Sequence, residues 1–402
     1  MTMINLNQIK NIMTIRYDPN EKVIFPILKP SVYNSCIDDF DGKITQNFLE
    51  QNISDVTQNN SSKISISLSS GIDSSLTLAL LRKIYPTKKL FAFCGVFIDS
   101  FDESITAKKI AENFEVDFKT VHMKSVFTDM PKIISITKKP KWNTYNHLIS
   151  KNAKKFSDIL FTGDGADEIF CGYTFRYQKF LKLIHKNDDW VIKTKKYLEC
   201  HNRDWVPDQN EIFYKSLNFN WDEIYKNFKE YFNNNLDPFQ QLILADFNGK
   251  LLFDFIPTTK AISNHYGIEI FSPFLKSNII NHGFGLSMKQ KYEPKSNKGK
   301  LILRKISKRL GIEHIDEKRG FTPSLLNDWE NHGKSICSTF LIKKDSEVFQ
   351  NKLINFDWVS KAFDKVNDEG DIRYLNRLIS ILALEIWYRL FVSKTLNPNK
   401  KL

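Results

Sequence analysis

Hydrophobic and polar positions follow two spacings along the first 165 residues. Apolar residues alternate with serines over 64–68, which predicts a strand, and they recur every four residues over 76–84, which predicts a helix. Residues 90–97 are apolar throughout, as in a strand that is buried on both faces of a parallel sheet. The same alternation of patterns continues with strands at about 114–118 and 159–162 and helices at about 102–111 and 146–156.

Strands that alternate with helices imply right-handed crossovers and an α/β fold built on an open, doubly wound, Rossmann-like parallel sheet. From about residue 175 to 392 helical patterns dominate, so we expect a largely α-helical C-terminal region. We divide the chain into an N-terminal extension (1–58), an α/β core (59–175) and a mostly helical part (176–395). Within the extension we expect a short strand over 22–28 and a solvated connection over 51–62.

Ligands of such sheets bind beyond the carboxyl ends of the strands. We therefore expect ligand-binding or catalytic residues just after residue 68, near Gly95 and just after Thr162.

Composition narrows the class of protein without deciding it. The 402 residues are 42% hydrophobic and 26% charged, which excludes wholesale disorder. The net charge of +12 fits an anionic ligand, a nucleic acid or a lysine-rich surface. Five scattered cysteines without a C-x-x-C pair favour reduced thiols and a cytoplasmic location. No signal peptide is evident, and the apolar stretch 378–392 contains Glu385 and Arg389, so we expect a buried helix and no membrane partner.

Residues 69–75 form a turn of small residues between the first predicted strand and its helix. Such a turn brings backbone N–H groups, serine hydroxyls and a helix N-terminus to an anion. Asp73 is placed to hold a metal ion that shares charge with phosphates. An ordinary helix cap rich in Ser and Asp explains the segment equally well. The segment is no Walker A loop, because G-K-[ST] is absent.

Residues 162–168 place three carboxylates beside two glycines after another short strand. Carboxylates this close repel one another unless a cation or a proton-transfer role stabilises them. The alternatives are a calcium-like surface turn or a second capped helix, although the spacing of an EF-hand loop is absent. Taken together, an anion-binding turn and an acidic loop at neighbouring strand ends fit a nucleoside triphosphate with Mg²⁺.

These motifs resemble a known family. SSGIDSS at 69–75 resembles the pyrophosphate loop S-G-G-x-D-S-S of the adenine nucleotide α-hydrolase, or N-type ATP pyrophosphatase, group. The segment 161–173, FTGDGADEIFCGY, resembles the more specific asparagine synthetase signature S-G-E-G-A-D-E-x-F-G-G-Y. Four further segments resemble this family in the same order: 272–275 (P-F-L-D), 300–304 (K-x-L-L-R), 318–321 (K-x-G-F) and 384–387 (L-E-x-W). The chain is therefore identified as a member of the asparagine synthetase family over about residues 60 to 392.

The resemblance implies an AMP-forming amide ligase. A carboxylate attacks the α-phosphate of ATP to give an acyl-adenylate and pyrophosphate, and an amine then displaces AMP. The cofactors implied are ATP and Mg²⁺. The matched positions imply pyrophosphate contacts from Ser69, Ser70, Gly71, Ser74 and Ser75, Mg²⁺ ligands Asp73 and Asp167, a base or orienting group Asp164, and nucleotide contacts from Thr162 and Gly163. They also imply an adenine pocket at Leu68, Cys94, Gly95 and Val96, for which a core role is an equal alternative. The resemblance implies that Lys300 neutralises charge on the pyrophosphate; the alternative is an ordinary surface lysine. It also implies that Arg304 and Lys318 either contact phosphate or form surface ion pairs.

The chain departs from the family pattern at several positions. Glutamine-hydrolysing members carry a nucleophilic cysteine after the initiator Met, within an N-terminal glutaminase domain, whereas this chain has Thr2 and fewer than 70 residues before the ATP loop. We therefore expect free ammonia, ammonia from a separate glutaminase subunit, or another amine. Asp164 replaces Glu, Ser70 and Cys171 replace glycines, and Phe271 and Lys276 replace Arg and Asp of E-V-R-x-P-F-L-D.

Three classes of function remain open at this point. The first is a ligase that activates aspartate or a related carboxylic acid, including one that cyclises its substrate as β-lactam synthetases do. The second is a tRNA-modifying pyrophosphatase, for which no basic-aromatic RNA-binding module or cysteine pair is evident, so we expect no nucleic-acid partner. The third is a nucleotide-binding relative without catalysis.

Overall fold

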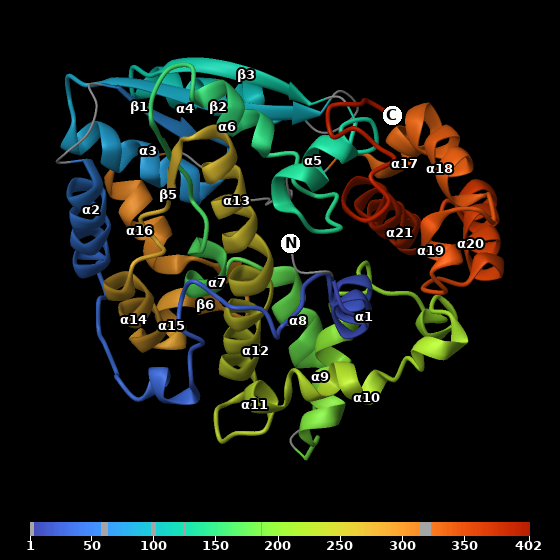
Figure 1. Ribbon diagram of the computed structural model, residues 1–402. Helices are drawn as coiled ribbons and strands as arrows, with labels where there is room; N and C mark the ends of the chain where they lie inside the picture. Colours follow the sequence, from blue (N-terminus) through green and yellow to red (C-terminus); the bar gives the residue numbers. More distant parts are fainter. Residues whose placement is uncertain (1–3, 58–62, 98–101, 124, 186, 313–322) are drawn as a thin grey trace.

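Five parallel strands form the sheet at the top of the molecule in Figure 1. The computed structural model describes residues 4–57, 63–97, 102–123, 125–185, 187–312 and 323–402. The strands lie in the order β3-β2-β1-β4-β5, and every neighbouring pair is parallel. Their bounds are β1 Lys63–Ser67, β2 Lys89–Phe97, β3 Asp117–Met123, β4 Ile159–Phe161 and β5 Glu269–Phe271. The doubly wound α/β fold is confirmed, and the strand order reverses between β1 and β4, where such sheets bind ligands.

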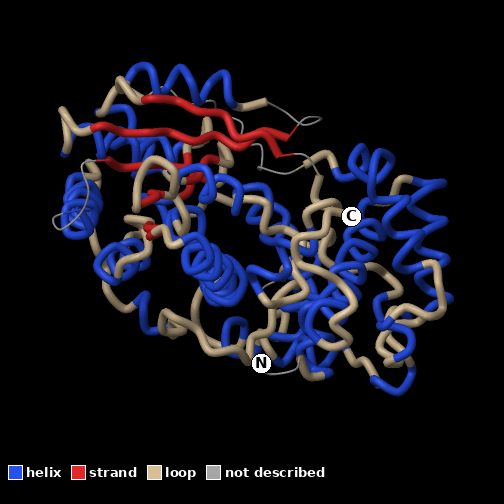
Figure 2. Tube along the Cα trace, turned by 45° about the horizontal axis from the view of Figure 1, so that its top comes forward, coloured by secondary structure: helices blue, strands red, loops and turns tan. Residues whose placement is uncertain are grey.

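Helices cover the sheet on both sides (Figure 2). Every residue of β2 after Lys89 is buried, which explains its unbroken apolar run. The helices that pack on the sheet or on each other beside it are α2 Lys43–Thr57, α3 Ile72–Ile84, α4 Ser104–Asn113, α6 His147–Ala153, α13 Ile256–Tyr266 and α16 Leu301–Arg309.

The helical part is organised around α21 (Ile372–Phe391), which is buried from Tyr374 to Trp387. This confirms the buried helix expected near the C-terminus. Helices that pack against it are α1 Leu6–Ile15, α5 Met130–Thr137, α17 Leu325–Asp328, α18 Lys334–Leu341, α19 Glu347–Gln350 and α20 Phe356–Glu369. In the part of the chain that the structure describes, no helix meets the length and apolarity needed to cross a bilayer.

The remaining elements form the lower part of Figure 1 and are mostly short. They are α7 Ala166–Phe170, α8 Thr174–Leu183, α9 Trp190–Glu199, α10 Trp221–Lys226, α11 Lys229–Phe232, α12 Pro238–Asp246, α14 Ser277–Gly285, α15 Met288–Lys291 and the hairpin β6 Tyr292–Glu293 with β7 Lys298–Gly299. Short 3₁₀ helices are η1 Pro30–Tyr33, η2 Gln209–Glu211 and η3 Lys215–Leu217, and π-helical turns are η4 Phe247–Phe255 and η5 Trp329–Gly333.

The structure corrects three local predictions. The third strand begins at Asp117 instead of 114, because α4 continues to Asn113 and Glu115 turns the chain with a φ of 52°. Residues 51–57 belong to α2 and not to a solvated connection, since Leu49 and Ile53 on that helix are fully buried in the core. No strand forms over 22–28, where the backbone of Leu28 instead bonds to the Asn248 side chain.

Candidate active site

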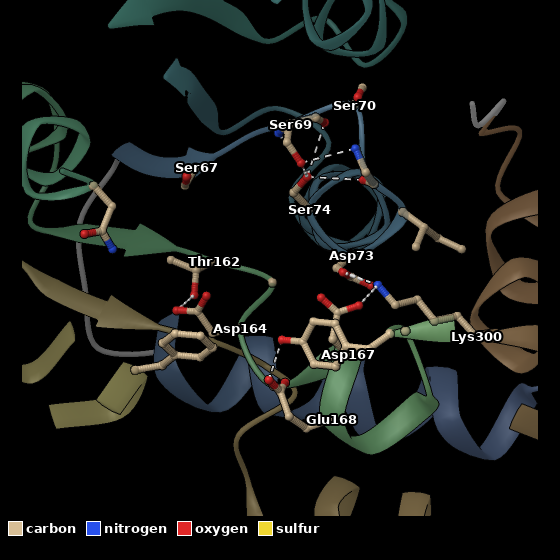
Figure 3. Close-up of a pocket in the computed structure, with 18 of the residues that line it drawn as sticks. Ser67, Ser69, Ser70, Asp73, Ser74, Thr162, Asp164, Asp167, Glu168 and Lys300 are labelled. Atoms are coloured by element: carbon tan, nitrogen blue, oxygen red, sulfur yellow. Dashed lines mark hydrogen bonds and ion pairs between the residues drawn. The ribbon is translucent and has the colours of Figure 1, made fainter. Parts of the chain in front are cut away.

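A cavity of about 920 Å³ opens at the carboxyl ends of the strands. Its lining includes both loops predicted from the sequence, together with the segment 296–300 and residues around the start of α13 (Figure 3). This volume is at the upper end of the range for small-molecule pockets. The two loops therefore face a common space, as the sequence predicted.

Hydrogen bonds among its own serines fix the first loop. The Ser74 hydroxyl lies 2.9 Å from that of Ser69 and accepts from the Ser69 amide at 3.0 Å. Gly71, with no side chain to offer, is the N-cap of α3, so its cap has no side-chain hydrogen bond. A serine- or aspartate-capped helix is thus not what the structure shows. The N-terminus of α3 instead opens onto the cavity, which favours an anion there.

The three carboxylates of the second loop point in different directions. Asp164 is exposed to the cavity and accepts a hydrogen bond from the Thr162 hydroxyl at 3.0 Å. Asp167 reaches toward Lys300, and Glu168 is buried, where the Tyr173 hydroxyl donates to it at 2.7 Å. The burial of Glu168 excludes a simple surface turn. The three carboxylates thus have different partners, although Asp167 still repels the other two.

Three glycines allow the segments of the site to approach closely. A Cβ on Gly163 would lie 2.7 Å from the Cβ of Asp73, so the two loops touch backbone to side chain. A Cβ on Gly172 would overlap the Asp167 carboxylate, and one on Gly299 would overlap the carbonyl oxygen of Cys171. These contacts bring the first loop, the second loop and the Lys300 segment together.

Lys300 joins the two loops electrostatically. Its Nζ lies 2.5 Å from Asp73 Oδ2 and 2.5 Å from Asp167 Oδ1 (Figure 3). Burial disfavours the ammonium, but attraction by Asp167 and Asp73 outweighs it and raises the pKa of Lys300 above its usual value. The residue is 4% exposed and its backbone is left-handed, with a φ of 55°. The surface-lysine alternative is excluded by this burial.

The pKa values of two cavity carboxyls are raised. Loss of hydration, followed by repulsion from Asp167, raises the pKa of Glu168 to about 7, against a hydrogen bond from Tyr173 that lowers it. Loss of hydration also raises the pKa of Asp164, with further repulsion from Asp73 and Asp167. Because the Asp164 side chain stays exposed to the cavity, water there limits this rise. Both carboxyls therefore bind a proton more readily than an ordinary surface acid.

The structure places most of the predicted site residues in one cavity. Those that line it are Leu68, Ser69, Ser70, Gly71, Asp73, Ser74, Gly95, Thr162, Gly163, Asp164, Asp167, Lys300 and Arg304. Ser75 and Val96 are not among the lining residues: Ser75 is fully buried and donates to the Gly71 carbonyl, and Val96 belongs to the core. Cys94 is likewise buried in the core. Lys318 and the rest of 318–321 lie outside the described residues.

Sequence reasoning missed Glu103 and one wall of the cavity. Glu103 accepts hydrogen bonds from Ser70, and its position just after a buried strand was the available signal. The wall comes from two segments that no motif marks: Asn143, Tyr145 and Asn146 before α6, and Asp254, Phe255, Thr258 and Thr259 at the start of α13. Buried Lys141 joins the two segments through Asp254 and Thr258.

Asp73 and Asp167 suit a magnesium ion that is shared with phosphates. Mg²⁺ is usually bound by one or two carboxylates together with substrate phosphates and water. Within the described ranges, no cluster of three or more His, Cys, Asp or Glu side chains suggests an all-protein metal site. A pair of carboxylates, one from each loop, fits the shared arrangement, and Asp73 and Asp167 would be the residues that hold the ion.

Comparison with known proteins shows the family of the chain. The family model for asparagine synthase matches residues 55–389. A glutamine-hydrolyzing asparagine synthetase of Bacillus subtilis is 22% identical over 83% of this chain and 57% of its own length. A putative glutamine-hydrolyzing asparagine synthetase of Methanocaldococcus jannaschii is 28% identical over 33% of this chain and 25% of its own length. The chain thus spans little more than half of the longer match. Among solved structures, an NH₃-dependent NAD synthetase from Campylobacter jejuni matches 50% of this chain and 99% of its own, with 16% identity and a TM-score of 0.25.

Proposed function

Because the chain belongs to the asparagine synthase family, we propose that it is an ATP-dependent ligase that joins a carboxylic acid to an amine through an acyl-adenylate. The observation that carries this proposal is the Asp73–Lys300–Asp167 bridge beneath a serine-lined anion loop in one cavity. ATP and a carboxylic acid, aspartate or a related one, would be substrates, and ammonia or another amine the acceptor.

In the first half-reaction the acid's carboxylate oxygen bonds to the α-phosphorus of ATP, and the bond to pyrophosphate breaks. The first loop and the N-terminus of α3 would hold the leaving pyrophosphate through N–H and hydroxyl donors. Lys300 stays protonated at neutral pH because of its two carboxylate neighbours, so it would offset the negative charge that grows on the leaving group. A Mg²⁺ ion at Asp73 and Asp167 would supply further charge compensation for the phosphates.

In the second half-reaction the amine attacks the acyl carbon and AMP leaves. The attacking nitrogen must lose a proton, and Asp164, a carboxylate that lines the cavity, would accept it. Its raised pKa moves its basicity toward neutral pH. Thr162 orients the Asp164 carboxylate through its hydroxyl.

The decisive experiment follows an isotope through the reaction. The chain is incubated with ATP, Mg²⁺, ammonium and a panel of acids labelled with ¹⁸O in the carboxylate, and AMP and the product are analysed by mass spectrometry. Acid-dependent pyrophosphate release with ¹⁸O in AMP is the expected result. Loss of water from the acid without nitrogen uptake would indicate cyclisation.

Two other outcomes would contradict the ligase proposal. Pyrophosphate release that requires tRNA would favour a tRNA-modifying enzyme. ATP binding without release in the presence of any acid would favour a non-catalytic protein. Asp73→Asn serves as the matched variant, and unchanged release in it would refute the metal assignment.

A further inference from the structure

Glu103 forms two hydrogen bonds to the loop that we assign to pyrophosphate. One of its oxygens, Oε2, accepts from the backbone N–H of Ser70 at 3.2 Å and from the Ser70 hydroxyl at 3.0 Å. Glu103 also lines the cavity. An internal carboxylate thus already binds both donors of one loop residue.

The position of Glu103 in its own helix makes this contact notable. It is the N-cap residue of α4, and the preceding Asp102 accepts a hydrogen bond from the backbone N–H of Ser104 at the start of that helix. The Glu103 side chain makes no cap hydrogen bond and is directed to Ser70. The hydroxyl it meets belongs to Ser70, which stands where the family pattern has glycine, so one of the two hydrogen bonds depends on a departure from that pattern.

A phosphate oxygen and Glu103 cannot use the same donors together. The Ser70 N–H and its hydroxyl each offer one hydrogen, and both are taken by Oε2. A phosphate brought to Ser70 would also lie against a carboxylate in a partly desolvated setting, and like charges repel strongly there.

We propose that Glu103 is an exchangeable anion of the pyrophosphate loop: it binds Ser70 in place of a phosphate oxygen and is displaced when ATP or pyrophosphate binds. This inference rests on the proposed function. Exchange with an internal group lowers the affinity for both ligands by the same factor, because only the fraction of molecules with Ser70 released is competent to bind. Weaker retention of pyrophosphate would assist its release after adenylation.

The test measures the Kd of MgATP and of inorganic pyrophosphate by titration calorimetry on the full chain. Glu103→Ala should bind both ligands about tenfold more tightly, since it removes two hydrogen bonds to a charged acceptor. Glu103→Gln keeps the shape and a neutral acceptor, so its Kd values should lie between those of wild type and Glu103→Ala. The neighbouring Asp102→Asn removes the same charge without touching Ser70 and should stay within about twofold of wild type.

Each possible result either supports or overturns the proposed exchange between Glu103 and phosphate at Ser70. Equal tightening for both ligands in Glu103→Ala, with Asp102→Asn unchanged, would support the exchange. Unchanged or weaker binding in the Glu103 variants, while wild type binds MgATP, would overturn this inference alone; a metal-ligand role for Glu103 would give the weaker binding. Tightening in Asp102→Asn as well would also overturn it, because general charge would then explain the effect. Failure of wild type to bind MgATP would overturn the proposed function and this inference with it.

Discussion

Replacing Lys300 by methionine tests the electrostatic centre of the site. Methionine keeps an unbranched chain of similar length but removes the ammonium that lies 2.5 Å from both Asp73 Oδ2 and Asp167 Oδ1. The two carboxylates, 17% and 18% exposed, would then face each other without the charge between them. Removing one partner of a buried ion pair costs about 3–5 kcal/mol, and water in the cavity reduces this, so we expect a loss of about 2–4 kcal/mol of stability.

The stability assay is urea unfolding followed by circular dichroism, with Lys305→Met as the control. Lys305 lies on α16, the helix directly after Lys300, is exposed and donates a hydrogen bond to the Phe40 carbonyl oxygen, so its loss should change stability by no more than about 0.5 kcal/mol. The pKa of Lys300 is raised, so its contribution is complete below the usual lysine pKa of about 10 and is lost only as pH rises beyond it. Lys300 therefore stays charged in wild type at both pH 6 and pH 8, and the comparison is made at pH 8, where the two carboxylates of Lys300→Met are least able to relieve their repulsion by taking up a proton.

Activity separates a catalytic role of Lys300 from a structural one. Loss of a preorganised positive group at a developing anion typically costs about 10²–10³ in kcat, which pyrophosphate release would report. In the double variant Lys300→Met/Asp167→Asn, removal of one carboxylate should restore part of the stability but none of the activity. The reasoning would be refuted by a Lys300→Met protein that is as stable as wild type and releases pyrophosphate at a rate within tenfold of it.

Four further predictions follow from the same geometry. Ile53→Ala should cost about 2–5 kcal/mol in urea unfolding, because this residue of α2 is fully buried, whereas exposed Ile44→Ala should cost little; equal effects would show that α2 is not part of the core. Gly172→Ala should lower both stability, by about 1–3 kcal/mol, and pyrophosphate release, since its Cβ would overlap the Asp167 carboxylate; a fully active variant would contradict the contact. Because the pKa of Glu168 is raised to about 7, the native state binds its proton more tightly than the unfolded chain does. Deprotonation of Glu168 should therefore lower the stability of wild type by at most about 3 kcal/mol between pH 5 and 7. In unfolding curves measured over this pH range, Glu168→Gln should show a smaller decrease. Asp164→Asn should abolish most turnover and the acid limb of the pH–rate profile, and a preserved limb would exclude Asp164 as the base.

Periodicity and motifs predicted the parts of the fold that are set locally. The first, second and fourth strands were placed within one or two residues, because buried parallel strands carry unbroken apolar or alternating runs. Both loops were found because the turn chemistry they need restricts their residue types. Strand β5 was not predicted, because three residues are too few to show an alternation of apolar and polar positions. The strand is defined by its pairing with β4.

Two of the predicted site residues, Ser75 and Val96, are not among the residues that line the cavity, and the geometry of their elements explains this. Ser74 and Ser75 are adjacent on α3, and a helix turns about 100° per residue, so only Ser74 lines the cavity. Gly95 and Val96 are adjacent on a strand, where successive side chains point to opposite faces. The wall near α13 depends on Lys141 and Asp254, which are more than 100 residues apart, and no local pattern reports such a pairing.

The structure changes how we interpret Phe271 and Lys276, two departures from the family pattern that concern the identity of the acid substrate. Neither residue lines the cavity: the Phe271 ring meets Phe161 edge-on at 5.4 Å, and Lys276 Nζ lies 5.4 Å above the Phe271 ring. A cation over an aromatic face thus stands where the family pattern places an Arg and an Asp. If the chain is the proposed ligase, we expect groups that line the cavity to select the acid, and Thr258 and Thr259 are among these groups. In pyrophosphate-release kinetics, Thr258→Val should therefore change the KM for the preferred acid more than Phe271→Arg does. The reverse ranking would show that residues of β5, and not Thr258, select the acid.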